Sequence, residues 1–348
     1  MKTSIYLIAV ILILSGCSST NLITMSVLEP APVSLPAHMK KIGTVNRSLP
    51  TEESKKMDKL DKILTLEISD MDGACWPKCI EGLTDELKKN DRFTEVKYLD
   101  KANLKSTASG TMPSPLSWDE VEKVCKDGNF DGLFVLELFD TDSKIGYEAR
   151  PVTIKGPLGV EVPGIEHHSS INTEIKTGWR IYDKVNKVII DEYNMPDRVL
   201  SEGKGINPAA AAQAVTGQKD RVKGRCIEMG KQYAQSILPY YITVYRDYYV
   251  RGCDNFKIAK RKAQTQNWDG AAELWKTETD NPKAKIAGRA CYNMAIKAEI
   301  DGDLDGAIKW ACKAYENYDN KLAIRYVNVL KYRKEQNSRL KNQQEDAQ

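Results

Sequence analysis

The sequence predicts a mixed α/β domain followed by an all-α domain of helical repeats, and three observations lead to this fold class. Residues 133–139 form an almost wholly apolar run, which is typical of a strand buried on both faces. Residues 171–181 alternate strictly between apolar and polar, which is typical of a strand with one solvated face. The tripeptide Asp-Gly-Ala at 269–271 recurs at 305–307, which indicates that the C-terminal part contains two similar units.

Length and composition agree with a two-domain globular protein. The chain has 348 residues, of which 41% are hydrophobic and 28% are charged. The formal net charge is +3, and this near balance argues against a dedicated nucleic-acid binder, which needs a clear basic excess. After the first residues, no other apolar run approaches the length that a transmembrane helix needs.

The N-terminus has the pattern of an export signal. Lys2 precedes an apolar stretch at 5–14, which is too short to span a bilayer and is followed by small residues. The sequence Leu14-Ser15-Gly16-Cys17 resembles the lipobox of bacterial lipoproteins. This resemblance implies a signal peptide at 1–16, acyl chains on Cys17 and stable membrane anchoring. Ser18, where an aspartate often marks inner-membrane retention in that family, points to the outer membrane and leaves the membrane face open.

Residues 17–36 are interpreted as a lipid-anchored tether, because prolines recur near its end. A first strand is expected at 42–45, a helix at 53–66, a second helix at 74–89 and a second strand at 93–99. The second helix carries an apolar stripe at four-residue spacing, which predicts buried free thiols rather than a metal or redox pair. The stripe consists of Cys75, Cys79, Leu83 and Leu87.

The middle of the chain is expected to contain one helix and three strands. Ser117 and Glu120 form a capping box that opens a helix. The buried strand at 133–139 is expected to end at Asp140 and Asp142, where sites of α/β proteins often lie. The strand at 171–181 turns through 183–187 into a returning strand at 188–193, which makes the sheet mixed.

The α/β domain is expected to close with helices and a strand. Asn207 and Pro208 begin one helix as N-cap and first residue, a longer helix follows, and Pro239 precedes a tyrosine-rich strand at 240–249. The α/β domain is therefore placed at 37–252. Its element order is similar to that of the small α/β domains of periplasmic lipoproteins of the curli-secretion and penicillin-binding-protein activator types.

Residues 253–340 show a repeat with a period of 36 residues. Ala259 recurs as Ala295, and Leu274 corresponds to Trp310. Small residues at fixed places in paired helices resemble tetratricopeptide repeats, with a capping helix from 321 to about 340 and a disordered tail at 341–348. The resemblance implies a face that binds a protein partner. The residues expected on that face are Trp275, Tyr292, Asn293 and Trp310. In the alternative interpretation, the helices are only a structural appendage.

Catalytic chemistry is not indicated by any pattern. His167 and His168 are expected in a solvated loop and make a poor metal site, and no nucleophile elbow, zinc-binding helix or phosphate-binding loop occurs. We therefore expect no enzyme activity, no cofactor and no metal. Two weaker hypotheses remain: glycan or peptidoglycan binding through Tyr245 or Tyr249, and a hydrolase that uses a residue such as Asp140.

The whole chain resembles a family of bacterial envelope lipoproteins with an N-terminal α/β domain and C-terminal tetratricopeptide-like repeats. The resemblance implies a membrane-anchored adaptor or assembly factor. Its expected partners are the membrane, through the acyl chains on Cys17, and another envelope protein at the repeats. Its expected location is the outer membrane.

Overall fold

The structure is a computed structural model that describes residues 19–48, 70–100, 104, 111–155, 159 and 161–347. The expected signal peptide, the lipidated Cys17 and the helix expected at 53–66 lie outside these described residues. The chain divides into two compact units. The sheet unit consists mainly of Ala31–Leu238, and the helical unit combines Met1–Pro30 with Pro239–Asn342.

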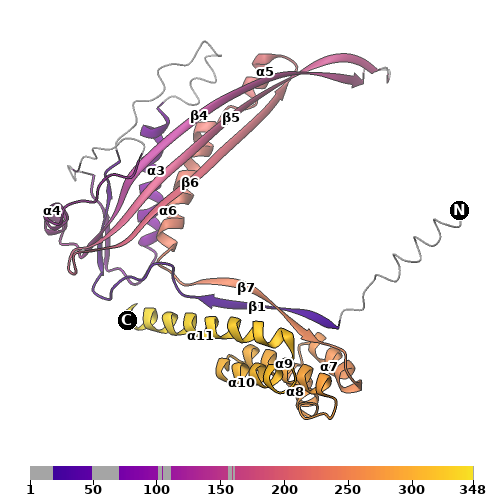
Figure 1. The fold of residues 1–348 in the computed structure, drawn as a ribbon. Helices are drawn as coiled ribbons and strands as arrows, with labels where there is room; N and C mark the ends of the chain where they lie inside the picture. Colours follow the sequence, from indigo (N-terminus) through magenta and orange to yellow (C-terminus); the bar gives the residue numbers. More distant parts are fainter. Residues whose placement is uncertain are drawn as a thin grey trace. The chain divides into compact units, whose positions relative to one another are not determined.

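A five-stranded mixed sheet forms the sheet unit (Figure 1). Strand β2 is parallel to its neighbours β3 and β4, whereas β5 is antiparallel to both of its neighbours, β4 and β6. This arrangement confirms the predicted mixed α/β domain. In spatial order the strands are β3 (Glu95–Tyr98), β2 (Lys41–Asn46), β4 (Gly132–Lys155), β5 (Glu161–Asp183) and β6 (Val188–Gly205).

Helices pack on both faces of the sheet near its base. On one face, α3 (Met71–Leu87) and α6 (Gln218–Gln235) enclose the core with Phe134 and Leu136. On the other face, α4 (Trp118–Gly128) packs on Leu133 and Val135, which confirms that the run at 133–139 is buried on both sides. The predicted capping box of Ser117 is present at the start of α4.

Helices α3 and α6 approach each other closely because glycines line their contact. A Cβ atom on Gly82 would lie 2.1 Å from the carbonyl oxygen of Ile227, and one on Gly230 would lie 2.0 Å from that of Cys79. Any larger side chain would therefore push the helices apart. The predicted cysteine stripe lies at this contact: Cys75, Cys79, Leu83 and Leu87 are all buried.

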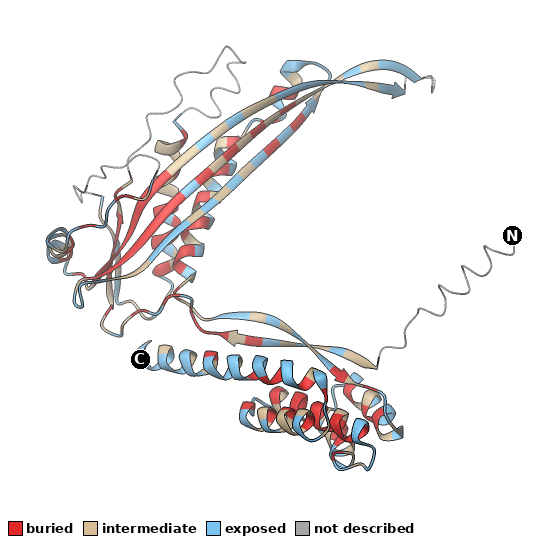
Figure 2. Ribbon diagram, in the orientation of Figure 1, coloured by how far each residue is buried: buried red, intermediate tan, exposed pale blue. Residues whose placement is uncertain are grey.

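Strands β4 and β5 are much longer than predicted, with 24 and 23 residues. The expectation that the buried strand ends at Asp140 is wrong, because Asp140 pairs with Lys176 inside the ladder that continues to Lys155 and Glu161. The expected loop at His167 and His168 is also wrong, since both residues lie within β5. Figure 2 shows that burial is concentrated near the sheet's base and that the distal hairpin is exposed. We call residues 142–155, 161–170 and 198–206 the β-arm.

The helical unit contains a second sheet that the sequence did not predict. Strand β1 (Thr20–Glu29) pairs antiparallel with β7 (Tyr240–Tyr249), from Thr20 opposite Tyr249 to Glu29 opposite Tyr240. Much of the segment interpreted as a tether is therefore a paired strand. The tyrosine-rich strand belongs to this ribbon rather than to the α/β sheet. The helices that follow β7 are α7 (Asp254–Gln264), α8 (Trp268–Lys276), α9 (Ala284–Ile300), α10 (Leu304–Glu316) and α11 (Lys321–Ala347). The short helix α5 (Pro208–Gln213) belongs to the sheet unit and lies between β6 and α6.

The 36-residue repeat is visible in the backbone of the two helix pairs α7–α8 and α9–α10. Asn267 caps α8 by accepting the backbone N–H of Gly270, and Asp303 caps α10 by accepting that of Gly306. The residue before each cap has positive φ, 63° at Gln266 and 80° at Gly302. The all-helical C-terminal region is thus confirmed. The expected disordered tail is wrong, because α11 continues to Ala347.

Candidate binding surfaces

The four residues predicted to bind a partner all lie in the helical unit, but three of them are buried. Trp275 and Asn293 have no exposed surface, and Tyr292 is 5% exposed. Trp310 is half-buried, with the Lys313 ammonium 5.5 Å from the centre of its ring. What Trp275, Tyr292 and Asn293 contact therefore decides what this face can do.

Asn293 binds the backbone of β7 with both ends of its amide. Its Oδ1 accepts the N–H of Tyr249 at 2.7 Å, and its Nδ2 donates to the carbonyl oxygen of Tyr249 at 2.7 Å. These are the two backbone groups through which a peptide would be recognised in an extended conformation. The helical face thus holds an extended segment, and that segment is the chain's own strand.

Aromatic side chains extend the same contact along the end of β7. Tyr248 meets Trp268 edge-on at 5.4 Å between ring centres and lies 6.1 Å from Trp275. Tyr249 meets Tyr292 edge-on at 5.4 Å. Each such pair adds about 0.5–1.5 kcal/mol beyond the burial of its area. Trp275 and Tyr292 therefore contribute to the packing of β7.

Glu299 joins β7 to two helices. The side chain of Glu299 is fully buried in α9, and its carboxylate accepts hydrogen bonds from Arg246 at 2.9 Å, from Arg333 at 2.5 Å and from the Tyr326 hydroxyl. Burial alone would raise the pKa of Glu299, but the bonds from Arg246 and Tyr326 outweigh it and hold that pKa below its ordinary value. The carboxylate is therefore ionised and links strand to helices.

The helical face that carries Trp275, Tyr292 and Asn293 is covered by β7. These residues are not exposed for a separate partner, because an element from elsewhere in the chain already uses the recognition chemistry that the repeat pattern indicates. The sequence prediction also missed Glu299. Its place on one helical face with Tyr292 and Ile296, both buried, could have marked it as a buried charge.

The sheet unit contains a second buried glutamate cluster. Glu137 lies between Arg47, at 2.7 Å, and Arg180, at 3.5 Å, and accepts the Tyr182 hydroxyl at 2.5 Å. Burial and the negative charge of the adjacent Glu137 both raise the pKa of the Tyr182 hydroxyl. The two arginines also donate to the carbonyl oxygens of Pro113 and Ser114, and the Tyr182 hydroxyl accepts the N–H of Leu116. The cluster therefore fixes the segment at 113–116 against the sheet.

The polar residues that the sequence singled out on β4 and β5 are engaged in pairs. Asp140 lies 3.6 Å from Lys176. His167 contacts the Tyr147 hydroxyl at 2.5 Å, and His168 contacts Glu166 at 2.7 Å. In the part of the chain that the structure describes, no group of three or more His, Cys, Asp or Glu side chains could hold a metal ion.

Large apolar side chains are exposed along the β-arm. Tyr147, Ile154, Val162, Ile165 and Leu200 are between 44% and 59% exposed. Charged pairs such as Glu148–Arg150 accompany them on the same hairpin. Among the helices that the structure describes, none combines the length and apolar character needed to cross a membrane.

Two family models match the chain. One is described as a domain of unknown function (DUF8603) and matches residues 39–249; the other is described as a domain of unknown function (DUF6340) and matches residues 257–332. The first match covers more than half of the chain. The chain belongs to the DUF8603 family. The DUF8603 region contains β7 but not its partner β1, and the second match begins within α7.

The comparison with curated proteins gives no match. Among solved structures, the PelC dodecamer from Paraburkholderia phytofirmans is 8% identical, with a TM-score of 0.23 over 61% of this DUF8603 chain and 96% of that chain. A putative neuraminyllactose-binding hemagglutinin homolog from Helicobacter pylori is 10% identical, with a TM-score of 0.25 over 60% of this chain and 90% of that one. At these TM-scores the likenesses carry no argument about function.

Proposed function

We propose that this chain is a lipid-anchored protein of the bacterial cell envelope that acts without catalysis, as an adaptor or assembly factor for another envelope protein. The lipobox-like sequence at Cys17 supports the anchor, and the capped helix pairs with their 36-residue period support a tetratricopeptide-like array. Ser18 favours the outer membrane. Strand β1 begins at Thr20, so the helical unit follows the proposed lipid after only a short connection.

The exposed apolar β-arm is the observation on which the adaptor function rests. The helical face at Asn293 is occupied by β7, so a partner needs another surface. Exposed apolar side chains bordered by charged pairs are typical of protein interaction surfaces, and the β-arm has this composition. We therefore assign the partner, an envelope protein, to the β-arm around Ile165.

Photo-crosslinking in cells tests this assignment. A photoreactive residue at Ile165, 59% exposed on the β-arm, is expected to give a protein adduct. The matched control is Ile324, a second exposed isoleucine, 39% exposed on α11. With the photoreactive residue moved to Val162, another exposed position of the β-arm, we expect Ile165→Asp to abolish capture, while Ile324→Asp leaves it intact. No adduct at Ile165, or the same adduct from both positions, would refute the β-arm as the working surface.

Fractionation tests the anchor separately. Wild-type protein is expected in the membrane fraction with acyl chains on residue 17, and Cys17→Ala is expected to lose acylation and to accumulate unprocessed. A wild-type protein that is processed but carries no lipid would remove the anchor from the proposal and leave the β-arm result standing.

Glycan or peptidoglycan binding is a second candidate function, which the exposed tyrosines of β7 favour. Tyr241 is 73% exposed and Tyr245 is 60% exposed, and both point to one side of the strand. Tyr249, the other tyrosine considered from sequence, is half-buried against Tyr292. Binding to isolated peptidoglycan that is lost in a Tyr241→Ala, Tyr245→Ala variant would support this function, and an unchanged affinity would exclude these two residues.

A further inference from the structure

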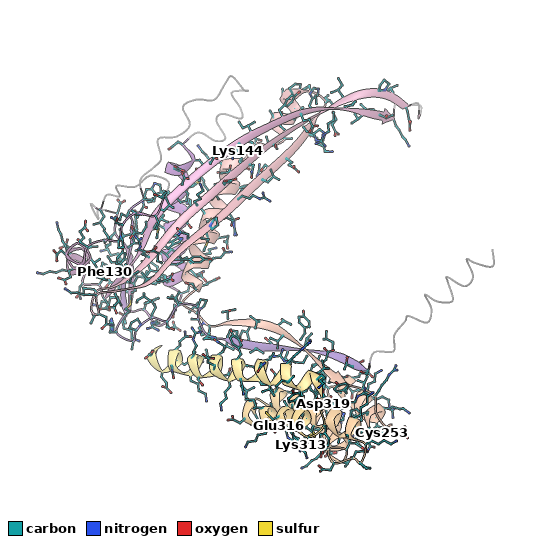
Figure 3. All side chains as sticks on the ribbon, viewed as in Figure 1. Phe130, Lys144, Cys253, Lys313, Glu316 and Asp319 are labelled. Atoms are coloured by element: carbon teal, nitrogen blue, oxygen red, sulfur yellow. The ribbon has the colours of Figure 1, made fainter. Side chains whose placement is uncertain are left out.

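A basic hollow lies beside the start of α7 in the helical unit. It has a volume of about 1080 Å³ and is lined by the residues that follow β7, by one side of α7 and by the turn before α9. Cys253, one of the lining residues, is labelled in Figure 3. The basic lining residues, which define the hollow here, are Arg251, Lys257, Lys260, Arg261 and Lys283.

Most of these positive charges are not neutralised. Asp254 is the one acidic lining residue, and it pairs with Lys257 at 2.8 Å. Within the described residues, no carboxylate forms an ion pair with the other four basic side chains. Two further acidic side chains lie beside the lining: Glu278 accepts from Asn255 and from the lining residue Asn281 and keeps its negative charge, whereas Asp280 pairs with Lys313. Five basic side chains therefore face two carboxylates, those of Asp254 and Glu278. The hollow therefore has an excess of positive charge that is available to a ligand.

The chemistry of the lining fits phosphate groups. Arg251 and Arg261 carry planar guanidinium groups that can donate two parallel hydrogen bonds to phosphate oxygens, and Lys260 and Lys283 add compact positive charges. A hollow of about 1080 Å³ has room for several phosphate-sized groups. The chain as a whole is nearly neutral, so it has little general attraction for anions. The unpaired basic side chains in the hollow therefore favour binding of an anionic surface at this one place.

The hollow lies next to the point where the proposed lipid joins the chain. The N–H of Val250, a lining residue, donates to the carbonyl oxygen of Ser19 at 2.9 Å. Ser19 is two residues after Cys17, a connection that spans at most about 7 Å. Lipid on Cys17 would thus hold the membrane surface close to the basic side chains. This step rests on the proposed lipid anchor.

We propose that the basic hollow binds the phosphate groups of anionic lipid headgroups in the membrane that holds the Cys17 lipid. The acyl chains supply attachment, and the hollow orients the helical unit on the surface. Basic side chains beside a membrane anchor strengthen binding to anionic lipid about fivefold for each charge. The hollow would also select the leaflet or lipid patch richest in such headgroups.

Vesicle sedimentation tests the hollow without the lipid. The chain that begins at residue 17, with Cys17→Ser, keeps every described residue and carries no acyl group. We expect it to bind phosphatidylcholine vesicles containing about a third phosphatidylglycerol, and not vesicles of phosphatidylcholine alone. The triple variant Arg251→Gln, Arg261→Gln, Lys283→Gln is expected to bind the anionic vesicles about a hundredfold more weakly. Circular dichroism checks that it remains folded.

A matched variant separates the hollow from general charge. Lys309→Gln, Arg325→Gln, Lys331→Gln removes the same charge from exposed positions elsewhere on the helical unit, and we expect less than a threefold loss. Equal losses in the two triple variants, or no preference of the unmutated chain for anionic vesicles, would overturn the proposal. Displacement from the vesicles by millimolar inorganic phosphate would assign the hollow to a soluble anion instead. Because the chain carries no lipid, these outcomes are independent of whether Cys17 is acylated.

Discussion

Glu137 in the sheet unit and Glu299 in the helical unit have the same kinds of neighbours, two arginines and a tyrosine, and both carboxylates are fully buried. The elements that they join are different. Arg180 and Tyr182 lie on β5, which a backbone ladder already holds against β4. Arg246 and Arg333 lie on β7 and α11, which share no such ladder with α9.

This difference separates reinforcement from attachment. Removing Glu137 would leave the hydrogen bonds of β4 and β5 in place and would mainly release the segment at 113–116. Removing Glu299 would take away a main connection between a strand and the helices that hold it. Similar buried charge clusters can therefore have different structural consequences, depending on whether backbone pairing already joins their members.

The largest expected effect comes from Glu299→Gln. It leaves Arg246 and Arg333 in a largely buried place without a carboxylate, and loss of one partner from a buried ion pair costs about 3–5 kcal/mol. Hydrogen exchange by mass spectrometry should show faster exchange across β7 and α9. Glu137→Gln is the comparison, and it should speed exchange mainly at 113–116. Opening of the whole five-stranded sheet in Glu137→Gln would contradict the different roles of the two glutamate clusters.

Asn293→Ala is expected to have the next largest effect, about 2–4 kcal/mol of unfolding free energy. The substitution leaves the N–H and the carbonyl oxygen of Tyr249 without partners, and each unsatisfied group costs about 1–3 kcal/mol; the lower part of that range applies because both bonds are only part-buried. Lys257 stands one repeat period earlier and is exposed, so Lys257→Ala is the matched control. Urea unfolding compares the two, and equal losses would show that Asn293 does not hold β7.

The pH dependence gives a smaller effect. The folded-state pKa of Glu299 is lowered, so its contribution to stability is complete above the unfolded-state pKa, near 4.5, and is lost as pH falls through the lower folded-state pKa. One proton changes the unfolding free energy by at most about 1.4 kcal/mol for each pH unit. Urea unfolding between pH 5 and pH 2 should show a shallower acid dependence for Glu299→Gln than for wild type; identical slopes would argue against a lowered pKa.

Local patterns predicted the elements whose residues make their own contacts. Ser117 and Glu120 lie within one helical turn, so the capping box could be recognised from their spacing. The apolar run at 133–139 could be recognised as a buried strand because helices cover both faces there, so that nearly every side chain in the run is apolar. The helical repeat was visible because its caps and small residues recur at a fixed interval.

Features that depend on distant residues were not predictable in this way. The alternation in β7 indicates a strand, but nothing local shows that its partner is β1, more than two hundred positions earlier. His167 and His168 were expected in a loop because both faces of the β-arm are largely exposed, which removes the alternation that marks a half-buried strand. Asn293 was expected to bind a protein partner, whereas in the structure it binds the backbone of Tyr249, a contact that no local pattern indicates.

The pairing of β1 with β7 also sets the order of folding events. Glu29 meets Tyr240, 211 positions later, so β1 is synthesised long before its partner strand is. Contacts between residues so far apart in the sequence form slowly, and until they form the unpaired strand is prone to associate with the wrong partner. The complete Ala31–Leu238 segment must be synthesised before the ribbon can close and the helices can pack on it.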